Sequence, residues 1–379
     1  MAKTGLREDF VCGKREGNVH GIRIIEFLIP YSNYDGMIKR GWLFLKFALR
    51  STRVALTRDY DLLFATSTPL TAAIPGIAMK LIRRKPFVFE VRDLWPELPK
   101  AMGVVRNPIV LTAMGSLERI AYRFADQCIG LSPGIVAGIR SKNVPSNNVT
   151  MIPNGCDLEL FKPSTDKGMD SDGIVPSDFV AIFSGAHGLA NGLDAVLDTA
   201  AALRTRGRLD IKLLLVGDGR LKPQLMERAK HEKLSNVIFL APVPKTTLSL
   251  ITARCHVGLM ILANVPAFYF GTSPNKFFDY IACGLPVLNN YPGWLADMIT
   301  KHDCGSVVVP ENPELFADAL IKMASNRAKL AWQAQNARAL AEGNFSRDLL
   351  AIQFSECLER TYARFIAKHS RKSLPASDQ

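Results

Sequence analysis

The 379-residue sequence predicts an α/β protein made of two Rossmann-like, doubly wound parallel-sheet domains that face each other across a cleft. Its length exceeds what one ordinary hydrophobic core organises and suits two domains of common size. Strand-like apolar runs alternate with helical patterns almost throughout the chain, which is typical of parallel sheets covered by helices. A polar segment at residues 163–177 contains several Pro and Gly residues and has the composition of a linker.

The first domain is expected to span residues 1–162. Its apolar runs predict strands at 22–27, 62–66, 87–91, 127–131 and 149–152. Apolar residues at helical spacing predict helices at 38–58, 70–83 and 108–124. The stretch 62–81 approaches membrane-spanning length, but Pro69 and Pro75 interrupt it, so a strand followed by a helix explains it better.

The second domain is expected to span residues 178–345. A helix is predicted at 193–204, and strands are predicted at 180–183, 211–216, 237–240, 257–262, 286–288 and 306–309. The last segment, 346–379, predicts a helix that packs back on the first domain, followed by a polar tail. Because ligands of open α/β sheets bind beyond the carboxyl ends of the strands, we expect the site in the cleft between the two domains.

Charge is distributed unevenly, since residues 1–165 contain 23 Lys and Arg against 14 Asp and Glu in a chain of formal net charge +12. The basic first half suggests an anionic partner: nucleic acid, phospholipid headgroups or a phosphorylated substrate. Nucleic acid is the least favoured, because the aromatic residues are not interleaved with the basic ones as a stacking platform requires. Seven scattered cysteines and six histidines show neither Cys-x-x-Cys nor HExxH spacing, which predicts reduced cysteines and no metal site.

Residues 270–288 read FGTSPNKFFDYIACGLPVL and predict a loop, a helix with a defined start and a buried strand. Ser273 is expected to cap the helix and Pro274 to occupy its first position. The free backbone amides of Asn275 and Lys276, together with the lysine side chain, would form an anion site suited to a diphosphate. Asp279 lies one turn later on the same side, where a carboxylate can accept hydrogen bonds from sugar hydroxyls. An ordinary capped helix is the alternative.

Two glycine-rich turns follow strands of the second domain and let the backbone approach a ligand closely. The first, at residues 184–192, has the spacing GxxGxxxG rather than GxGxxG, so a nicotinamide site is not supported. The second follows the strand 211–216 and ends in an arginine that could meet phosphate. A connection without a ligand is the alternative for both turns. The candidate donor-binding residues in these turns are Gly185, His187, Gly188, Asn191, Gly217, Gly219 and Arg220.

In the first domain, the segment EVRDLWPE at residues 90–97 places charged side chains at the end of an apolar strand. Charges at this position should line the cleft rather than the core. Arg92 and Asp93 are therefore candidates for orienting donor and acceptor, with a structural ion pair between them as the alternative. Glu97 and Asn154 are assigned to the acceptor side, although the Asn-Gly turn at 154–155 is a turn signal with no necessary chemistry.

Five motifs occur in an order that resembles the family-4 type of GT-B glycosyltransferases: EVRDLWPE (90–97), IPNGCDLELF (152–161), SGAHGLANGLD (184–194), VGDG (216–219) and GTSPNKFFDYIACGLPV (271–287). The likeness runs from about residue 21 to residue 365. It is strongest to bacterial enzymes that add N-acetylated amino sugars such as L-fucosamine during O-antigen, capsule or exopolysaccharide assembly. The resemblance implies a retaining transfer, without metal or cofactor, from a UDP-type nucleotide sugar bound mainly by the second domain to a polyprenyl-diphosphate-linked acceptor.

The resemblance transfers family roles only where residues match. Asp279 takes the place of the second acid of the E-x7-E motif, which in the family contacts the nucleotide ribose, whereas the first acid falls on Gly271. The basic pair that many relatives use against the diphosphate falls near His187 and Asn191, so Lys276 and the helix-start amides would have to stabilise the leaving group. The expected catalytic residues are Arg92, Asp93, Lys276 and Asp279.

Two departures accompany the resemblance. Many relatives have a histidine where this chain has Arg92, so a histidine-dependent role does not transfer. First domains of the family open with a strand, a glycine-rich loop and a helix, whereas the strand 22–27 resembles a later strand and residues 1–17 look too polar and short to replace the unit. At least one βα unit is therefore expected to be missing. The alternatives are a nucleotide-sugar epimerase of the same fold and a truncated, inactive glycosyltransferase-like binding protein.

The predicted helix at 38–58 bears on location, because a cationic sector lies beside a broad apolar one. The cationic sector contains Lys39, Lys46, Arg50 and Arg53. The rest of the surface carries Trp42, Phe44, Leu45, Leu49 and Leu56. A helix lying on anionic lipid has this pattern, and a core-packed helix with a solvated basic face is the alternative. We therefore expect a cytoplasmic protein that is peripheral on the anionic inner face of the cytoplasmic membrane.

Overall fold

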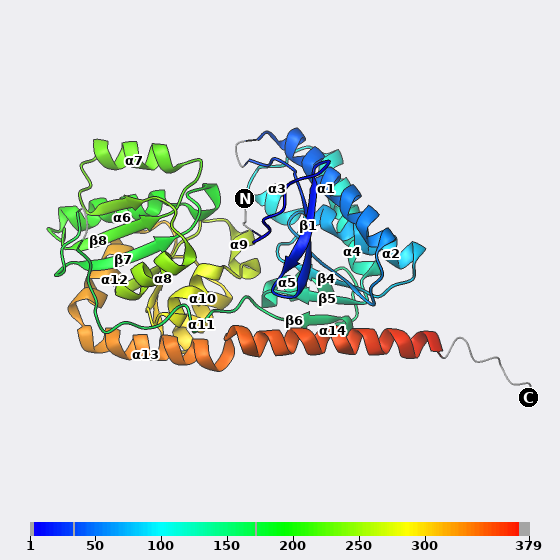
Figure 1. The fold of residues 1–379 in the computed structure, drawn as a ribbon. Helices are drawn as coiled ribbons and strands as arrows, with labels where there is room; N and C mark the ends of the chain where they lie inside the picture. The colour runs from blue at the N-terminus through cyan, green and yellow to red at the C-terminus, as the bar shows by residue number, and fades with distance from the viewer. Residues whose placement is uncertain (1–3, 33–34, 171–172, 371–379) are drawn as a thin grey trace, which may run out of the picture.

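The first of two α/β lobes contains a four-stranded parallel sheet in the order β3-β4-β5-β6 (Figure 1). The computed structural model describes residues 4–32, 35–170 and 173–370. The strands of this sheet are β3 (Leu63–Thr66), β4 (Phe87–Val91), β5 (Gln127–Gly130) and β6 (Val149–Met151). The helices of this lobe are α1 (Met37–Thr57), α2 (Ala73–Ile82), α3 (Glu97–Ala101), α4 (Pro108–Phe124) and α5 (Pro133–Arg140), with short 3₁₀ turns η1 (Leu70–Ala72) and η2 (Ser146–Asn148).

The second lobe contains a six-stranded parallel sheet in the order β12-β11-β10-β7-β8-β9. Its strands are β7 (Phe179–Ser184), β8 (Ile211–Val216), β9 (Val237–Leu240), β10 (Val257–Met260), β11 (Val287–Asn289) and β12 (Gly305–Val307). Its helices are η3 (Leu189–Asn191), α6 (Asp194–Thr205), α7 (Lys222–His231), α8 (Lys245–Arg254), α9 (Pro266–Gly271), α10 (Asn275–Ala282), α11 (Trp294–Lys301), α12 (Pro313–Ser325) and α13 (Arg327–Asn344). The predicted class of two Rossmann-like parallel-sheet domains is confirmed.

The strand predicted at 22–27 does not belong to a parallel sheet. β1 (Lys14–Val19) and β2 (Ile22–Phe27) pair antiparallel in a separate two-stranded hairpin, so the expected likeness to a strand of the parallel sheet is wrong. The cause is local: His20 and Gly21 have φ of 51° and 81°, which is the geometry of a two-residue hairpin turn. Asn18 Oδ1 also accepts a hydrogen bond from the Gly21 amide at 2.8 Å. Among the described strands, β3 is therefore at the edge of its sheet.

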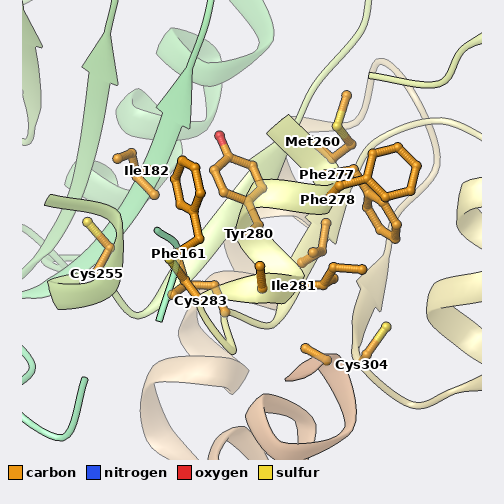
Figure 2. Close-up of a cluster of buried hydrophobic side chains, with 14 of the residues drawn as sticks. Phe161, Ile182, Cys255, Met260, Phe277, Phe278, Tyr280, Ile281, Cys283 and Cys304 are labelled. Atoms are coloured by element: carbon orange, nitrogen blue, oxygen red, sulfur yellow. The ribbon is translucent and has the colours of Figure 1, made fainter. Parts of the chain in front are cut away.

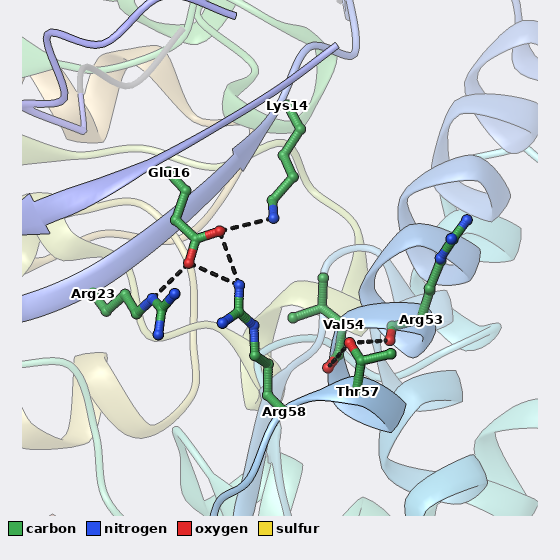
Figure 3. A network of polar contacts seen from close by, with 7 residues as sticks. All are labelled: Lys14, Glu16, Arg23, Arg53, Val54, Thr57 and Arg58. Carbon is green, nitrogen blue, oxygen red and sulfur yellow. Dashed lines mark hydrogen bonds and ion pairs between the residues drawn. The ribbon is translucent and has the colours of Figure 1, made fainter. Parts of the chain in front are cut away.

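Glu16 connects this hairpin to the end of α1 (Figure 3). Its carboxylate lies 2.8 Å from Lys14 Nζ and 2.9 Å from Arg58, and Arg23 also pairs with it. Just before Arg58, the Thr57 hydroxyl donates to backbone carbonyl oxygens of the last turn of α1. The ion pair between Glu16 and Arg58 orients the hairpin against the end of the helix.

One of the two core clusters of the second lobe is built around α10 (Figure 2). Phe277, Phe278, Tyr280 and Ile281 have no exposed surface. Burying each of these side chains contributes ~2 kcal/mol. A Cβ at Gly258 of β10 would lie 2.4 Å from the Tyr280 ring, so a glycine is needed for the helix to approach this strand. The buried part of α10 therefore fixes the position of the first turn of this helix.

α14 (Arg347–Ser370) crosses from the second lobe to the first and runs along its sheet (Figure 1). Its Leu350 and Cys357 pack against Val88, Ile129 and Ile152 of the first lobe. Backbone hydrogen bonds between residue 156 and residues 345 and 347 join the lobes at the crossing. The polar tail expected after this helix lies outside the described residues. In the part of the chain that the structure describes, no helix combines the length and apolarity needed to cross a membrane.

Candidate functional site

Two glycine turns lie against each other beyond the carboxyl ends of β7 and β8. The two strands pair in parallel, with Ser184 opposite Val216. Gly185 and Gly217 have φ of +151° and +147°, and a Cβ at Gly217 would lie 1.9 Å from the Gly185 carbonyl oxygen. The backbone therefore requires glycine at 217. These turns adjoin the switch point between β7 and β10, where doubly wound sheets bind their ligands.

The side chain of Lys276 reaches from the first turn of α10 toward these glycine turns. Its Nζ donates a hydrogen bond to Asn191 Oδ1 at 3.0 Å and lies 3.8 Å from the centre of the Phe183 ring. A Cβ at Gly185 would come within 3.2 Å of the same Nζ. Burial lowers the pKa of Lys276 to about 7, although part of the residue remains accessible. An anion bound here would raise this pKa again, because it favours the charged amine.

The start of α10 differs from the predicted cap. The helix begins at Asn275 with Pro274 as the N-cap residue, and no side chain caps it. Ser273 Oγ instead accepts a hydrogen bond from the Asn154 backbone N–H at 3.3 Å, and Asn154 Nδ2 donates to the Ser273 carbonyl oxygen. The predicted Ser273 cap is therefore wrong, because the first lobe engages this hydroxyl. The amides of Asn275 and Lys276 have no hydrogen-bond partner among the described residues, as an anion site requires.

Asp279 lies one turn further along α10 and is only 7% exposed. Its carboxylate is 3.6 Å from Nζ of Lys245, the first residue of α8. Burial raises the pKa of Asp279 to about 6, and Lys245 partly offsets this shift. Nothing in the sequence around Lys245 singles it out, because its partner lies on a different helix.

His187 lies behind the first glycine turn rather than on its surface. It has no exposed area, and neither ring nitrogen has a hydrogen-bond partner among the described residues. The ring lies between Phe183 and Phe239, at centre-to-centre distances of 6.1 and 6.2 Å. Burial lowers the pKa of His187 to about 4, and Lys222 adds to this effect, so the ring is neutral near pH 7. This packing corrects the expectation of a donor-facing His187 ring.

The remaining candidates of the two turns have different surroundings. A Cβ built at Gly188 would meet no atom within 4 Å, so the space beside it is open. Arg220 is exposed, and no ion pair joins it to the described residues.

Lys222, which the sequence did not indicate, donates hydrogen bonds to the carbonyl oxygens of Gly217 at 2.7 Å and Leu240 at 2.8 Å. It therefore holds the second glycine turn against the end of β9. A Cβ at Gly219, which was also predicted to bind the donor, would lie 2.5 Å from the carbonyl oxygen of residue 187.

The first-lobe candidates lie at the end of β4. Arg92 Nη1 is 3.6 Å from Glu90 Oε2, and the Arg92 backbone N–H donates to Ser67 Oγ at 2.8 Å. Asp93 accepts a hydrogen bond from Thr68 Oγ1 at 3.1 Å, and burial raises the pKa of Asp93. The alternative of an ion pair between Arg92 and Asp93 is therefore wrong, because the arginine pairs with Glu90.

The lobes meet where α9 contacts α3 and α5. Glu97, the first residue of α3, is exposed and forms an ion pair with Lys142 at 3.0 Å. The structure brings Asn154 to the start of α10, whereas no hydrogen bond or ion pair among the described residues joins Arg92 or Asp93 to that helix. Within residues 4–32, 35–170 and 173–370, no three His, Cys, Asp or Glu side chains are grouped so as to hold a metal ion.

Comparison with known proteins begins with two family models. Residues 4–155 match the model described as a glycosyl transferase 4-like domain, and residues 178–326 match the one described as glycosyl transferases group 1. EpsF of Bacillus subtilis (strain 168), named as a glycosyltransferase, is 27% identical over 213 residues. These residues are 55% of this chain and 49% of EpsF, so the chain matches about half the length of that relative.

Solved structures show the same architecture. HepE from Anabaena, in complex with UDP and glucose, is 20% identical with a TM-score of 0.65, covering 86% of this chain and 83% of that one. Sucrose-phosphate synthase from Thermosynechococcus elongatus is 17% identical with a TM-score of 0.72, covering 93% and 86% respectively. At these identities the likeness is one of fold. The chain therefore has the GT-B fold of glycosyltransferases, with a first domain of the glycosyl transferase 4-like kind and a second of the group 1 kind.

Proposed function

We propose that this chain is a retaining glycosyltransferase that moves a sugar from a UDP-type nucleotide sugar to a lipid-linked saccharide in surface polysaccharide assembly. The observation that carries the proposal is the start of α10, where two free backbone amides and the Lys276 amine converge beside the glycine turns. Such a group of donors is complementary to a diphosphate. The likeness in fold to HepE in complex with UDP supports the same class of ligand.

The rest of the donor contacts follow from the same helix. Asp279 is proposed to accept hydrogen bonds from the ribose hydroxyls, with Lys245 beside it partly balancing the charge of the acid. Gly271 stands where relatives have the first acid of E-x7-E, and a Cβ there would meet no atom within 4 Å. This open space leaves room for a donor sugar that carries a bulky substituent. We therefore assign the donor as an N-acetylated amino sugar.

The proposed chemistry needs a group that stabilises the negative charge developing on the leaving diphosphate. Lys276 and the α10 amides supply a cation and donors at one place, so the mechanism requires neither a metal ion nor a further cofactor. The acceptor hydroxyl attacks the anomeric carbon from the face that the diphosphate leaves and passes its proton to the departing diphosphate, so the anomeric configuration is retained. Arg92 and Asp93 are assigned to orienting the reactants, and Glu97 and Asn154 to the acceptor side.

We also propose that the acceptor is polyprenyl-diphosphate-linked and that α1 places the enzyme on the anionic inner face of the cytoplasmic membrane. Ile38, Trp42 and Leu49 are 82%, 68% and 60% exposed, so α1 turns an apolar stripe toward solvent. The exposed Lys39 and Lys46 lie on the same helix. An exposed apolar stripe beside cations fits a helix in the membrane interface.

A thermal-shift screen of nucleotide sugars, followed by transfer assays with a polyprenyl-diphosphate-linked acceptor with and without EDTA, tests the proposal. A UDP-sugar should raise Tm, because it binds the native state preferentially, and should be transferred in the presence of EDTA. Interconversion of free UDP-sugars would identify an epimerase instead. Stabilisation without turnover would identify an inactive binding protein, and no stabilisation by any nucleotide sugar would contradict the proposal altogether.

A further inference from the structure

A buried acid lies beneath the segment that joins β4 to α4. Glu118 of α4 is only 1% exposed, although glutamate is rarely buried to this extent. Its Oε1 accepts hydrogen bonds from the Trp95 backbone N–H at 3.2 Å and from the Tyr122 hydroxyl at 2.9 Å. Its Oε2 has no hydrogen bond within the described residues, and its nearest cation is Lys142 Nζ at 3.7 Å.

The charged and titratable groups around this acid come from three elements. Tyr122 and Arg119 lie on α4, Glu97 begins α3, and Lys142 follows α5. Lys142 bridges the acids, since it lies 3.0 Å from Glu97 Oε1 and 3.7 Å from Glu118 Oε2. Burial raises the pKa of Glu118 to about 7, and Tyr122 and Lys142 oppose this shift. The acid therefore changes its charge near neutral pH.

The segment above Glu118 carries the proposed first-lobe site. Residues 92–102 include Arg92, Asp93 and Glu97, and the hydrogen-bonded Trp95 amide lies two residues after Asp93. The same segment ends in α3, whose Leu98, with the following Met102, packs against the core of the second lobe. A change at the Trp95 amide would therefore move both the proposed acceptor side and the contact between the lobes.

We propose that Glu118 is a positioning residue whose carboxylate holds the segment 92–102 through the Trp95 amide and Lys142, and that loss of its charge releases this segment. This proposal rests on the proposed function, in which the segment 92–102 contributes to the acceptor side of the site. A charged acceptor makes the stronger hydrogen bond to a backbone amide, so protonation weakens the bond to Trp95. Protonation also leaves Lys142 with Glu97 as its remaining acidic partner.

The direction of the pH effect follows from the charge of the acid. Above about pH 7 Glu118 is ionised and the segment is held, whereas below it the carboxyl is neutral and the segment is released. The acceptor KM should therefore rise as pH falls through 7. Donor affinity should instead increase as pH falls, because protonation of Lys276 favours binding of the diphosphate. Measuring both constants separates the two groups.

The first experiment measures acceptor KM, kcat and the Kd for UDP of the full chain and of Glu118→Gln between about pH 6 and pH 8.5. In the wild type, acceptor KM should rise about fivefold toward the acid end, as loss of one hydrogen bond predicts. Glu118→Gln should show the raised KM across the whole range, while its Kd for UDP should keep the pH dependence that Lys276 gives the wild type. Asp178→Asn is the matched control, because it removes another buried carboxylate, 6% exposed, that lies in the second lobe. A Glu118→Gln variant with the wild-type pH profile would overturn the proposal.

A second measurement needs no turnover. The Trp95 side chain is partly buried, and its buried Nε1 has no hydrogen-bond partner among the described residues, so its emission should report movement of the segment. The Trp95 signal, obtained as the difference between the wild type and Trp95→Phe, should titrate with a midpoint near pH 7. Lys142→Gln should shift that midpoint upward by about one pH unit, because removing a nearby cation favours the neutral acid.

The two measurements distinguish the proposals. If the wild type transfers no sugar, the proposed function fails, and the Trp95 titration still tests Glu118. If transfer occurs but the Trp95 signal lacks the midpoint, or Lys142→Gln leaves it in place, the role of Glu118 is refuted. Lys142→Gln also keeps the test available if Glu118→Gln does not fold.

Discussion

Asn154 donates two hydrogen bonds to Ser273, one from its backbone N–H to the hydroxyl at 3.3 Å and one from its side-chain amide to the carbonyl oxygen. Asn154 follows β6 of the first lobe, whereas Ser273 lies two residues before α10 of the second. The pair therefore joins the lobes at the start of the proposed donor helix, and the position of the free amides there depends on the interface between the lobes.

Asn154→Ala should weaken UDP binding without unfolding the protein. The substitution removes the side-chain hydrogen bond but keeps the backbone one, so the loss is ~1 kcal/mol, or about fivefold in Kd. Isothermal titration calorimetry measures this change. Asn148→Ala is the control, because the Asn148 side chain has no hydrogen-bond partner in the part of the chain that the structure describes. If Asn154→Ala binds UDP as the wild type does, the interface does not govern the donor helix.

Lys276→Met should abolish most transfer while leaving the fold intact. A hydrogen bond from a charged group contributes ~1.5–3 kcal/mol, so kcat/KM should fall by about 10- to 100-fold. Methionine keeps the contact with the Phe183 ring and removes a desolvated amine, so Tm should not fall. Lys301→Met, at an exposed position of α11, should retain wild-type turnover. Wild-type turnover in Lys276→Met would show that the diphosphate binds elsewhere.

The affinity for UDP should decrease as pH rises above about 7. Burial lowers the pKa of free Lys276 to about 7, and the bound diphosphate raises it, so binding above this pH takes up a proton. Linkage then raises the Kd for UDP by up to about tenfold per pH unit, until the pH reaches the pKa that Lys276 has in the complex. Calorimetry in two buffers of different ionisation enthalpy measures the uptake. Lys276→Met should bind weakly and lack this slope, and a wild-type Kd that is constant from about pH 7 to pH 9 would contradict the assignment.

Asp279→Ala should remove the preference for a ribose hydroxyl. The wild type is expected to bind UDP more tightly than 2′-deoxy-UDP or 3′-deoxy-UDP, by about three- to tenfold for the hydroxyl that the carboxylate contacts. Asp279→Ala should bind UDP and that deoxy analogue equally. Asp297→Ala is the control at an exposed acid of α11. A variant that still discriminates would show that another group recognises the ribose.

The parallel sheets could be predicted because their strands are continuous apolar runs whose side chains are buried on both faces of the sheet. β8 (Ile211–Val216) and β4 (Phe87–Val91) match the predicted ranges at every residue, and both are almost wholly buried. The helix predicted at 70–83 begins instead as the short turn η1, followed by α2. The boundary differs because local spacing does not determine where a helix first closes its hydrogen bonds.

The residues that were misjudged depend on distant partners. Ser273 has a typical capping position in the sequence, but Asn154 from the other lobe engages it. His187 stands in a glycine turn, but Phe183 and Phe239 enclose its ring. Lys245 could not be found, because a lysine at a helix start is common and its acidic partner lies on another helix. Lys276 and Asp279 were identified from a local helix pattern, and their roles remain proposals.

Full-length protein should bind vesicles that contain anionic lipid through α1. Its apolar stripe includes Trp42, which is 68% exposed, and the exposed Lys39, Lys46 and Arg53 lie on the same helix. Each cation near an anionic surface contributes ~1 kcal/mol, so replacing all three by Gln should weaken binding by about 100-fold or more, and added salt should weaken the wild type similarly. Co-sedimentation with anionic and with neutral vesicles measures this effect.

Trp42→Ala separates insertion of the apolar stripe from attraction by charge alone. Insertion of the indole into the interface should shift the Trp42 emission to shorter wavelength when vesicles are added, and the alanine variant should lose both this shift and part of the affinity. Trp332→Ala is the matched control, since Trp332 is 55% exposed on α13 of the second lobe. Equal binding to neutral vesicles, or binding that neither Trp42→Ala nor the triple Gln variant weakens, would show that α1 does not face the membrane.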